Sequence, residues 1–84
     1  MSDSNNTFTV SSAEFGKIFS EYKPRFVIIA RSYVRDLAMA EDIVTDCFMY
    51  YWENRDKIEI RKDIPSYILT AVQHRCLNRL RDER

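Results

Sequence analysis

The residues of this chain that could do chemistry are a pair of carboxylates, one histidine and two cysteines. Asp42 and Asp46 stand one helical turn apart, a spacing at which two carboxylates could act as acid and base. His74 is the only histidine, and a zinc site shared with Cys76 would place its two ligands on different sides of a helix. Gly16 is the only glycine, so there is no glycine-rich phosphate loop. We therefore expect a protein that is not an enzyme and that uses no metal or cofactor.

A second group of residues suits nucleic acid. Arginine and lysine neutralise phosphates, Asn, Gln and His can hydrogen-bond to base edges, and aromatic rings can stack on unpaired bases. All three kinds occur near the end of the chain: Lys57, Arg61, Lys62, Tyr67, Gln73, His74, Arg75, Asn78, Arg79 and Arg81. Arginines close to a helix C-terminus are also favoured by the helix dipole alone, so a merely solvated helix end remains an alternative.

Charge is divided along the chain although the total is zero. Residues 1–35 carry +2, residues 36–54 carry −5 and residues 55–84 carry +3. An acidic middle between basic ends favours two partners of opposite charge. No apolar run is long enough to span a membrane, and the first residues are too polar for a signal peptide, so we expect a cytoplasmic protein.

The composition predicts one all-α domain, a compact bundle of three to four helices. Apolar residues make up 45% of the 84 residues, and one Gly with two Pro leaves little material for turns. Residues 1–11 are rich in Ser, Asn and Thr and predict a flexible N-terminal arm, followed by the helical domain over residues 12–84.

Two helices are expected before the acidic segment. Ser11 and Glu14 have the spacing of a capping box, which predicts a first helix that ends near Tyr22. Pro24 cannot donate a backbone hydrogen bond, so we expect it to begin a new helix that continues to about Val34.

The central helix is expected to follow a short joint over residues 36–39 and to end near Asn54. Its apolar positions recur at helical spacing and comprise Ile43, Val44, Cys47, Phe48, Tyr51 and Trp52. Its opposite side, the acidic face, comprises Glu41, Asp42, Thr45, Asp46 and Glu53. Acids near the start of a helix also serve as caps, so only part of this charge is available for a partner.

A loop over residues 55–63 separates this helix from the last one. The last helix is predicted from Pro65, with Asp63 as its cap, to about Asp82. Its apolar stripe comprises Ile68, Leu69, Val72, Cys76 and Leu80, with Tyr67 and Leu77 beside it. Cys47 and Cys76 both fall on apolar or mixed faces, so we expect buried free thiols rather than a disulfide.

The order of these parts resembles region 2 of the ECF type (extracytoplasmic-function) of bacterial sigma factors, in the form found in Bacteroidetes. The residues that carry the resemblance are Glu41-Asp42-Ile43-Val44-Thr45-Asp46 with Phe48 and Trp52, and then Pro65-Ser66-Tyr67-Ile68-Leu69-Thr70-Ala71-Val72 with Arg75-Cys76-Leu77 and Leu80-Arg81. It extends from Phe15 to Arg84, over nearly all of the expected helical domain.

The resemblance implies a transcription initiation domain that binds core RNA polymerase and recognises and melts the minus-ten promoter element. By position, the residues that would dock on the clamp helices of the polymerase β′ subunit are Asp42, Thr45, Asp46 and Met49. The loop and the last helix would hold the non-template strand, with a flipped base in a pocket formed by residues 55–66 and Tyr67 as a stacking wall. An anti-sigma factor could cover the docking residues, and a monomer is the default expectation.

Four departures from the family pattern matter. Thr45 stands where Gln is most common in the docking motif, His74 where Asn is usual, and Asn78 where Asp is usual. The last two lie on the DNA-facing side, so the promoter preference of relatives cannot be transferred to this chain. Full members of the family continue into region 4, which is absent from this chain, so we expect a fragment of a longer sigma factor.

Two other interpretations stay open at this point. One is a helical protein-interaction module that uses the acidic face and has no DNA role, and the other is an enzyme fragment that holds a metal with Asp42 and Asp46. In the leading interpretation the two surfaces are distinct: the acidic face contacts protein and avoids DNA, whereas the loop and the last helix do the reverse.

Overall fold

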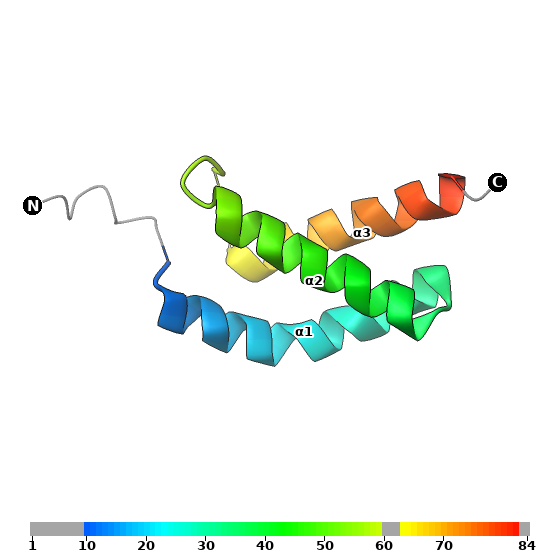
Figure 1. The fold of residues 1–84 in the computed structure, drawn as a ribbon, viewed down its shortest axis with the longest axis horizontal. Helices are drawn as coiled ribbons and strands as arrows, with labels where there is room; N and C mark the ends of the chain where they lie inside the picture. The colour runs from blue at the N-terminus through cyan, green and yellow to red at the C-terminus, as the bar shows by residue number, and fades with distance from the viewer. Residues whose placement is uncertain (1–9, 60–62, 83–84) are drawn as a thin grey trace, which may run out of the picture.

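Three helices make up the fold. The structure is a computed structural model that describes residues 10–59 and 63–82. These residues form α1 (Ser12–Val34), α2 (Leu37–Asn54) and α3 (Ile64–Asp82), and each helix packs on the other two. The chain reverses direction after α1 and again after α2, so α2 runs antiparallel to both of its neighbours (Figure 1). The predicted all-α bundle is confirmed, while most of the predicted N-terminal arm, residues 1–9, lies outside the described residues.

Helix α1 continues through Pro24, so the prediction of a new helix at this residue is wrong. A proline inside a helix removes one hydrogen bond and costs about 3 kcal/mol or more. The apolar stripe of α1 continues on both sides of the proline, and Phe15 and Phe26 are both buried against Phe48 of α2. Burial of each such side chain contributes about 1.5–3 kcal/mol, which offsets the loss. Ser20, whose carbonyl loses its donor, is exposed, so water can replace that donor.

The ends of the helices are fixed by the caps that the sequence predicts. Ser11 and Glu14 form the capping box of α1: the Glu14 N–H donates to the Ser11 hydroxyl at 3.1 Å, and the Ser11 N–H donates to the Glu14 carboxylate at 3.2 Å. The Asp36 carboxylate accepts the Met39 N–H at 3.1 Å at the start of α2, which begins at Leu37, so the predicted joint over residues 36–39 is too long. The N–H of Ser66 donates to Asp63 at 2.8 Å at the start of α3, whose first residue is one earlier than predicted.

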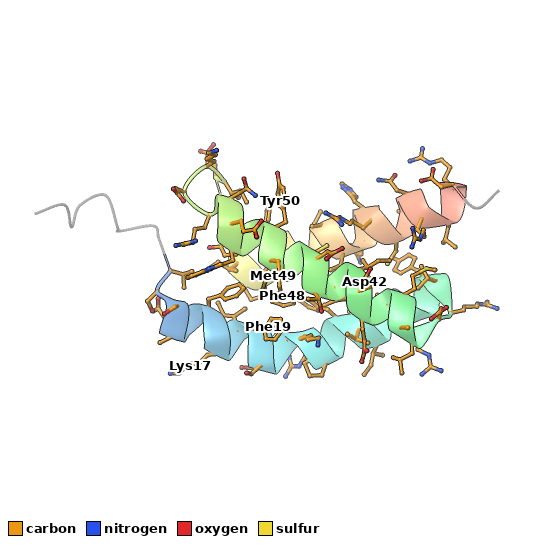
Figure 2. The ribbon with its side chains drawn as sticks, viewed as in Figure 1. Lys17, Phe19, Asp42, Phe48, Met49 and Tyr50 are labelled. Atoms are coloured by element: carbon orange, nitrogen blue, oxygen red, sulfur yellow. The ribbon has the colours of Figure 1, made fainter. Side chains whose placement is uncertain are left out.

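Phe48 occupies the centre of the core and has no exposed surface. Its ring centroid lies 6.1 Å from that of Phe15, 5.1 Å from that of Phe19 and 5.9 Å from that of Phe26. Phe19 and Phe48 can be followed between α1 and α2 in Figure 2. The apolar stripe predicted for α2 is confirmed, because five of its members are buried and Trp52 is half-buried against Phe15, with ring centroids 4.7 Å apart.

Helix α3 closes the bundle with the stripe predicted for it. Ile68, Val72 and Cys76 have no exposed surface, and the Cys76 thiol lies 4.0 Å from the Ala30 carbonyl oxygen of α1. Leu77 was expected beside this stripe but is 50% exposed, so it lies on the solvent side. No helix in the described part of the chain is long and apolar enough to cross a membrane.

Candidate functional site

The predicted polymerase-binding residues lie along one side of α2. Asp42 and Asp46 are exposed, Thr45 is half-buried, and Met49 is 38% exposed. Asp42 and Met49 are labelled on α2 in Figure 2, two turns of helix apart. The opposite stripe of α2 is fixed in the core, so the helix cannot rotate these side chains away. We call these four residues the docking surface, because two carboxylates beside an apolar side chain can offer charge-assisted hydrogen bonds next to a hydrophobic contact.

The solvent side of α3 carries most of the predicted DNA-binding residues. His74, Asn78 and Arg81 are exposed, and together with Leu77 they line a shallow hollow of about 300 Å³. Arg81 Nη2 donates to Asn78 Oδ1 at 2.6 Å. This side of α3 therefore brings together one ring, one amide and one guanidinium group, which are the groups that contact bases and phosphates.

Two more predicted DNA-binding residues of α3, Gln73 and Arg79, are not among the residues that line this hollow. Arg79 is exposed and Gln73 is half-buried. Arg79 lines a second cleft, of about 240 Å³, between α2 and α3. Asp42 and Asp46 of the docking surface line the same cleft, so this arginine faces the acids of α2.

One ion pair joins the two predicted surfaces. Arg75 Nη1 of α3 lies 3.7 Å from Asp46 Oδ2 of α2, and 46% and 53% of the two side chains are exposed. The acidic face and the basic helix therefore meet along one edge, while the contrast expected between their partners stays a prediction. The antiparallel course of α2 and α3 brings residue 46 beside residue 75, although 29 positions separate them in the sequence.

The connection between α2 and α3 and the first turn of α3 supply the other predicted DNA-binding residues. Lys57 is exposed and Tyr67 is half-buried. Burial raises the pKa of Tyr67, and the neighbouring hydroxyl of Tyr50 raises it further, so the phenol remains neutral and can present its ring or donate its proton. Arg61 and Lys62 lie outside the described residues.

The comparison with known families decides what these surfaces belong to. Residues 18–84 match the family model of sigma-70 region 2. The chain belongs to the sigma-70 region 2 family. No curated protein and no solved structure matches it. The region 2 domain of a sigma factor binds core RNA polymerase and recognises the minus-ten element, and its family is not enzymatic. Polymerase binding and minus-ten recognition are therefore confirmed at the level of the family, and this decides against a module without a DNA role and against a metal enzyme.

One pair of residues in this sigma region 2 domain was not anticipated from the sequence. The guanidinium carbon of Arg55 lies 3.7 Å from the centroid of the Trp52 ring, and Arg55 also donates to the Trp52 carbonyl oxygen. A cation three residues after a tryptophan at the end of a helix is the signal that could have predicted this contact. It fixes the beginning of the connection that leads to α3.

The two cysteines of the sigma region 2 domain are buried and free, as predicted. Burial raises the pKa of Cys47 to about 11 and also raises the pKa of Cys76. Both are neutral thiols near pH 7, and a neutral thiol is a poor nucleophile and a poor metal ligand. Within residues 10–59 and 63–82, no group of three His, Cys, Asp or Glu side chains could hold a metal ion.

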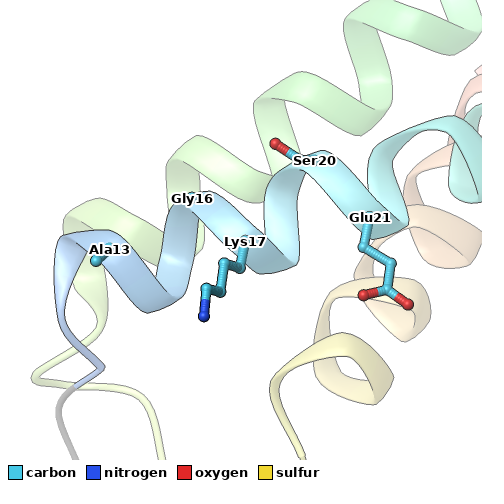
Figure 3. A pocket seen from close by; sticks show the side chains of 5 residues that line it. All are labelled: Ala13, Gly16, Lys17, Ser20 and Glu21. Carbon is cyan, nitrogen blue, oxygen red and sulfur yellow. The ribbon is translucent and has the colours of Figure 1, made fainter.

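A wide depression on the outer side of α1 is separate from the docking surface and from α3. It has a volume of about 650 Å³ and is lined by Ala13, Gly16, Lys17, Ser20 and Glu21 (Figure 3). None of these residues belongs to α2 or α3. Small side chains create the hollow, and its one lysine and one glutamate offer no chemistry that the family's function requires.

Proposed function

We propose that this chain is region 2 of an ECF-type sigma factor of the Bacteroidetes form and that it acts in the cytoplasm. It docks on the clamp helices of the polymerase β′ subunit through Asp42, Thr45, Asp46 and Met49. The connection over residues 55–63 and α3 then hold the non-template strand of the minus-ten element. The subtype is supported by the motif of α2, in which an acidic face is followed by Trp52, and by its distance from the tyrosine and arginines of α3.

The single observation that carries the docking assignment is the exposure of two carboxylates one turn apart on a helix whose other side is buried. Asp42 and Asp46 are exposed, and Met49 beside them is partly so. An exposed carboxylate can accept charge-assisted hydrogen bonds from a lysine or arginine of a partner. Thr45 is shorter than the Gln usual at this position, so it adds a hydroxyl and little reach.

The DNA assignment is supported by the hollow on α3. His74, Asn78 and Arg81 combine hydrogen-bonding groups with a guanidinium group, and Tyr67 offers a neutral ring at the start of the helix. His74 and Asn78 replace the residues usual at these positions, so we expect a base preference that differs from that of other family members. Asn in place of Asp also removes a negative charge near the phosphates, which favours binding.

A charge reversal tests the docking assignment. Asp46→Lys should abolish binding to a fragment that carries the β′ clamp helices, because it replaces an acceptor by a like charge. The matched control is Glu41→Lys, which makes the same change on the same helix at a residue outside the docking surface. Circular dichroism checks that both variants keep the fold. Equal binding by Asp46→Lys and the wild type would overturn the assignment.

The DNA assignment is tested with single-stranded minus-ten DNA in the presence of core polymerase. Arg79→Glu should weaken binding, because it places a negative charge near the phosphates. Lys17→Glu is the control, since it makes the same charge change on the outer side of α1. Equal weakening by both variants would show that only the net charge of the domain matters.

Two further parts of the proposal concern partners. We propose that the isolated domain is a monomer and that an anti-sigma factor would act by covering the docking surface. Sedimentation measures the first. The second predicts that such an inhibitor and the clamp-helix fragment compete, and that Asp46→Lys weakens both complexes.

A further inference from the structure

The ion pair between α2 and α3 links the two proposed binding surfaces through one shared contact. Asp46 belongs to the docking surface and Arg75 to the proposed DNA-binding residues, yet in the free domain the two side chains are paired at 3.7 Å. While the pair is intact, each charge is partly neutralised by the other, so neither side chain interacts with an outside partner at full strength. A protein that binds Asp46 therefore releases the guanidinium group of Arg75 for another interaction.

We propose that Asp46 and Arg75 form an exchange pair. A basic side chain of the docking protein takes the place of Arg75 at Asp46, and the released guanidinium group then binds a DNA phosphate. This inference rests on the proposed function, because it needs both the docking surface and DNA binding by α3. It adds that the two binding events favour each other and names the contact through which they do so.

The surroundings of the pair fit such an exchange. Both side chains are about half exposed, so partners can reach them from solvent. The cleft between α2 and α3 continues from the pair to Asp42 on the α2 side and to Arg79 on the α3 side, where Asp82 also lines it. Each member of the pair thus has a neighbour of its own sign, and this neighbour attracts the same incoming partner: a cation toward the two aspartates, a phosphate toward the two arginines.

The helices themselves cannot move apart to relieve the pair. Ile43 and Cys47 of α2 and Val72 and Cys76 of α3 are buried on the sides that face the core. The backbone positions of residues 46 and 75 are fixed by this packing. Exchange therefore takes place between side chains, with no change of fold.

The size of the effect follows from the exposure of the pair. Half-exposed ion pairs are weak, so breaking this one changes an affinity by about two- to five-fold. Linkage requires the effect to be mutual: the clamp-helix fragment should strengthen DNA binding by the factor by which DNA strengthens binding of the fragment.

The first test uses the free chain and single-stranded minus-ten DNA, followed by NMR titration, which measures weak binding. Asp46→Asn should raise DNA affinity by about two- to five-fold more than Asp42→Asn does. Both variants remove one negative charge from the same helix, but only the first frees Arg75. Equal gains for the two variants would overturn the exchange pair, because long-range charge alone would then explain them.

The second test measures the coupling itself. The clamp-helix fragment should raise the DNA affinity of the wild type and of Arg79→Gln by about two- to five-fold, but should leave that of Arg75→Gln unchanged. Arg75→Gln should also bind the fragment about two- to five-fold more tightly than Arg79→Gln, since no pair has to be broken.

Failure of the inference can be told apart from failure of the proposed function. If both ligands bind and depend on Asp46 and Arg79 but neither changes the affinity for the other, the exchange pair is wrong and the proposed function stands. If the fragment binds Asp46→Lys as well as the wild type, the docking assignment fails and the exchange pair fails with it.

Discussion

The salt dependence of DNA binding measures how many phosphates of the strand are contacted by cationic side chains of this domain. The proposed DNA-binding residues include six cations, Lys57, Arg61, Lys62, Arg75, Arg79 and Arg81. For single strands, the logarithm of the affinity falls with the logarithm of salt concentration with a slope of about −0.7 per phosphate contacted. Six contacts give a slope of about −4, so that doubling the salt weakens binding about 20-fold. Arg79→Gln removes one contact and should reduce the slope to about −3.5.

The measurement is fluorescence anisotropy of a labelled single-stranded minus-ten oligonucleotide, with the domain saturated by the clamp-helix fragment so that Arg75 is released. Lys17→Gln is the control, because it removes a cation from the outer side of α1 and should leave the slope unchanged. The reasoning is refuted if Arg79→Gln and Lys17→Gln have the slope of the wild type. It is also refuted if the wild-type slope is near zero, since phosphate contacts would then contribute nothing.

Three further predictions concern the fold. Gly16 is exposed, and a Cβ added there would meet nothing within 4 Å. Gly16→Ala should therefore raise the free energy of unfolding, measured by urea titration, by about 0.5–1 kcal/mol. An unchanged or lower free energy of unfolding would contradict this. Phe48→Ala should lower the free energy of unfolding by about 3–5 kcal/mol, a large part of the stability of a small domain, with a clear fall in the melting temperature. Phe48→Leu should lower the free energy of unfolding by less. The pKa of Cys47 rises from 9.0 to about 11 on folding, so the unfolded chain loses this proton first and stability should fall between about pH 9 and pH 11. Cys47→Ala should make that fall smaller, as measured by urea midpoints at each pH, and an identical fall would refute the assignment.

The features that depend on neighbours in the sequence could be predicted from it. The capping box of Ser11 and Glu14, the cap Asp63, and the apolar stripe around Phe48 are all set by spacings of three or four residues. The same spacings place Asp42 and Asp46 on one exposed face. The roles of these two residues stay predictions, because exposure shows only that a partner can reach them.

The features that depend on tertiary packing could not be predicted in the same way. Whether α1 continues past Pro24 is decided by how well Phe15 and Phe26 bury against Phe48, which no local pattern reports. The ion pair of Asp46 with Arg75 depends on the register between α2 and α3, and the connection over residues 55–63 is long enough to permit several registers. Local periodicity therefore predicted the apolar and charged sides of each helix, and tertiary packing determined which of these sides lie in contact.

The joint between α1 and α2 differs in kind from the one between α2 and α3. Only Arg35 and Asp36 separate the first two helices: the Arg35 N–H donates to the Arg31 carbonyl at 2.8 Å in a left-handed C-cap, and Asp36 caps the next helix. A joint this short has little chain entropy to lose, whereas the nine-residue connection between α2 and α3 closes a longer loop at a greater entropic cost. We therefore expect the α1–α2 hairpin to form first during folding and α3, with the residues proposed for DNA, to pack on it last.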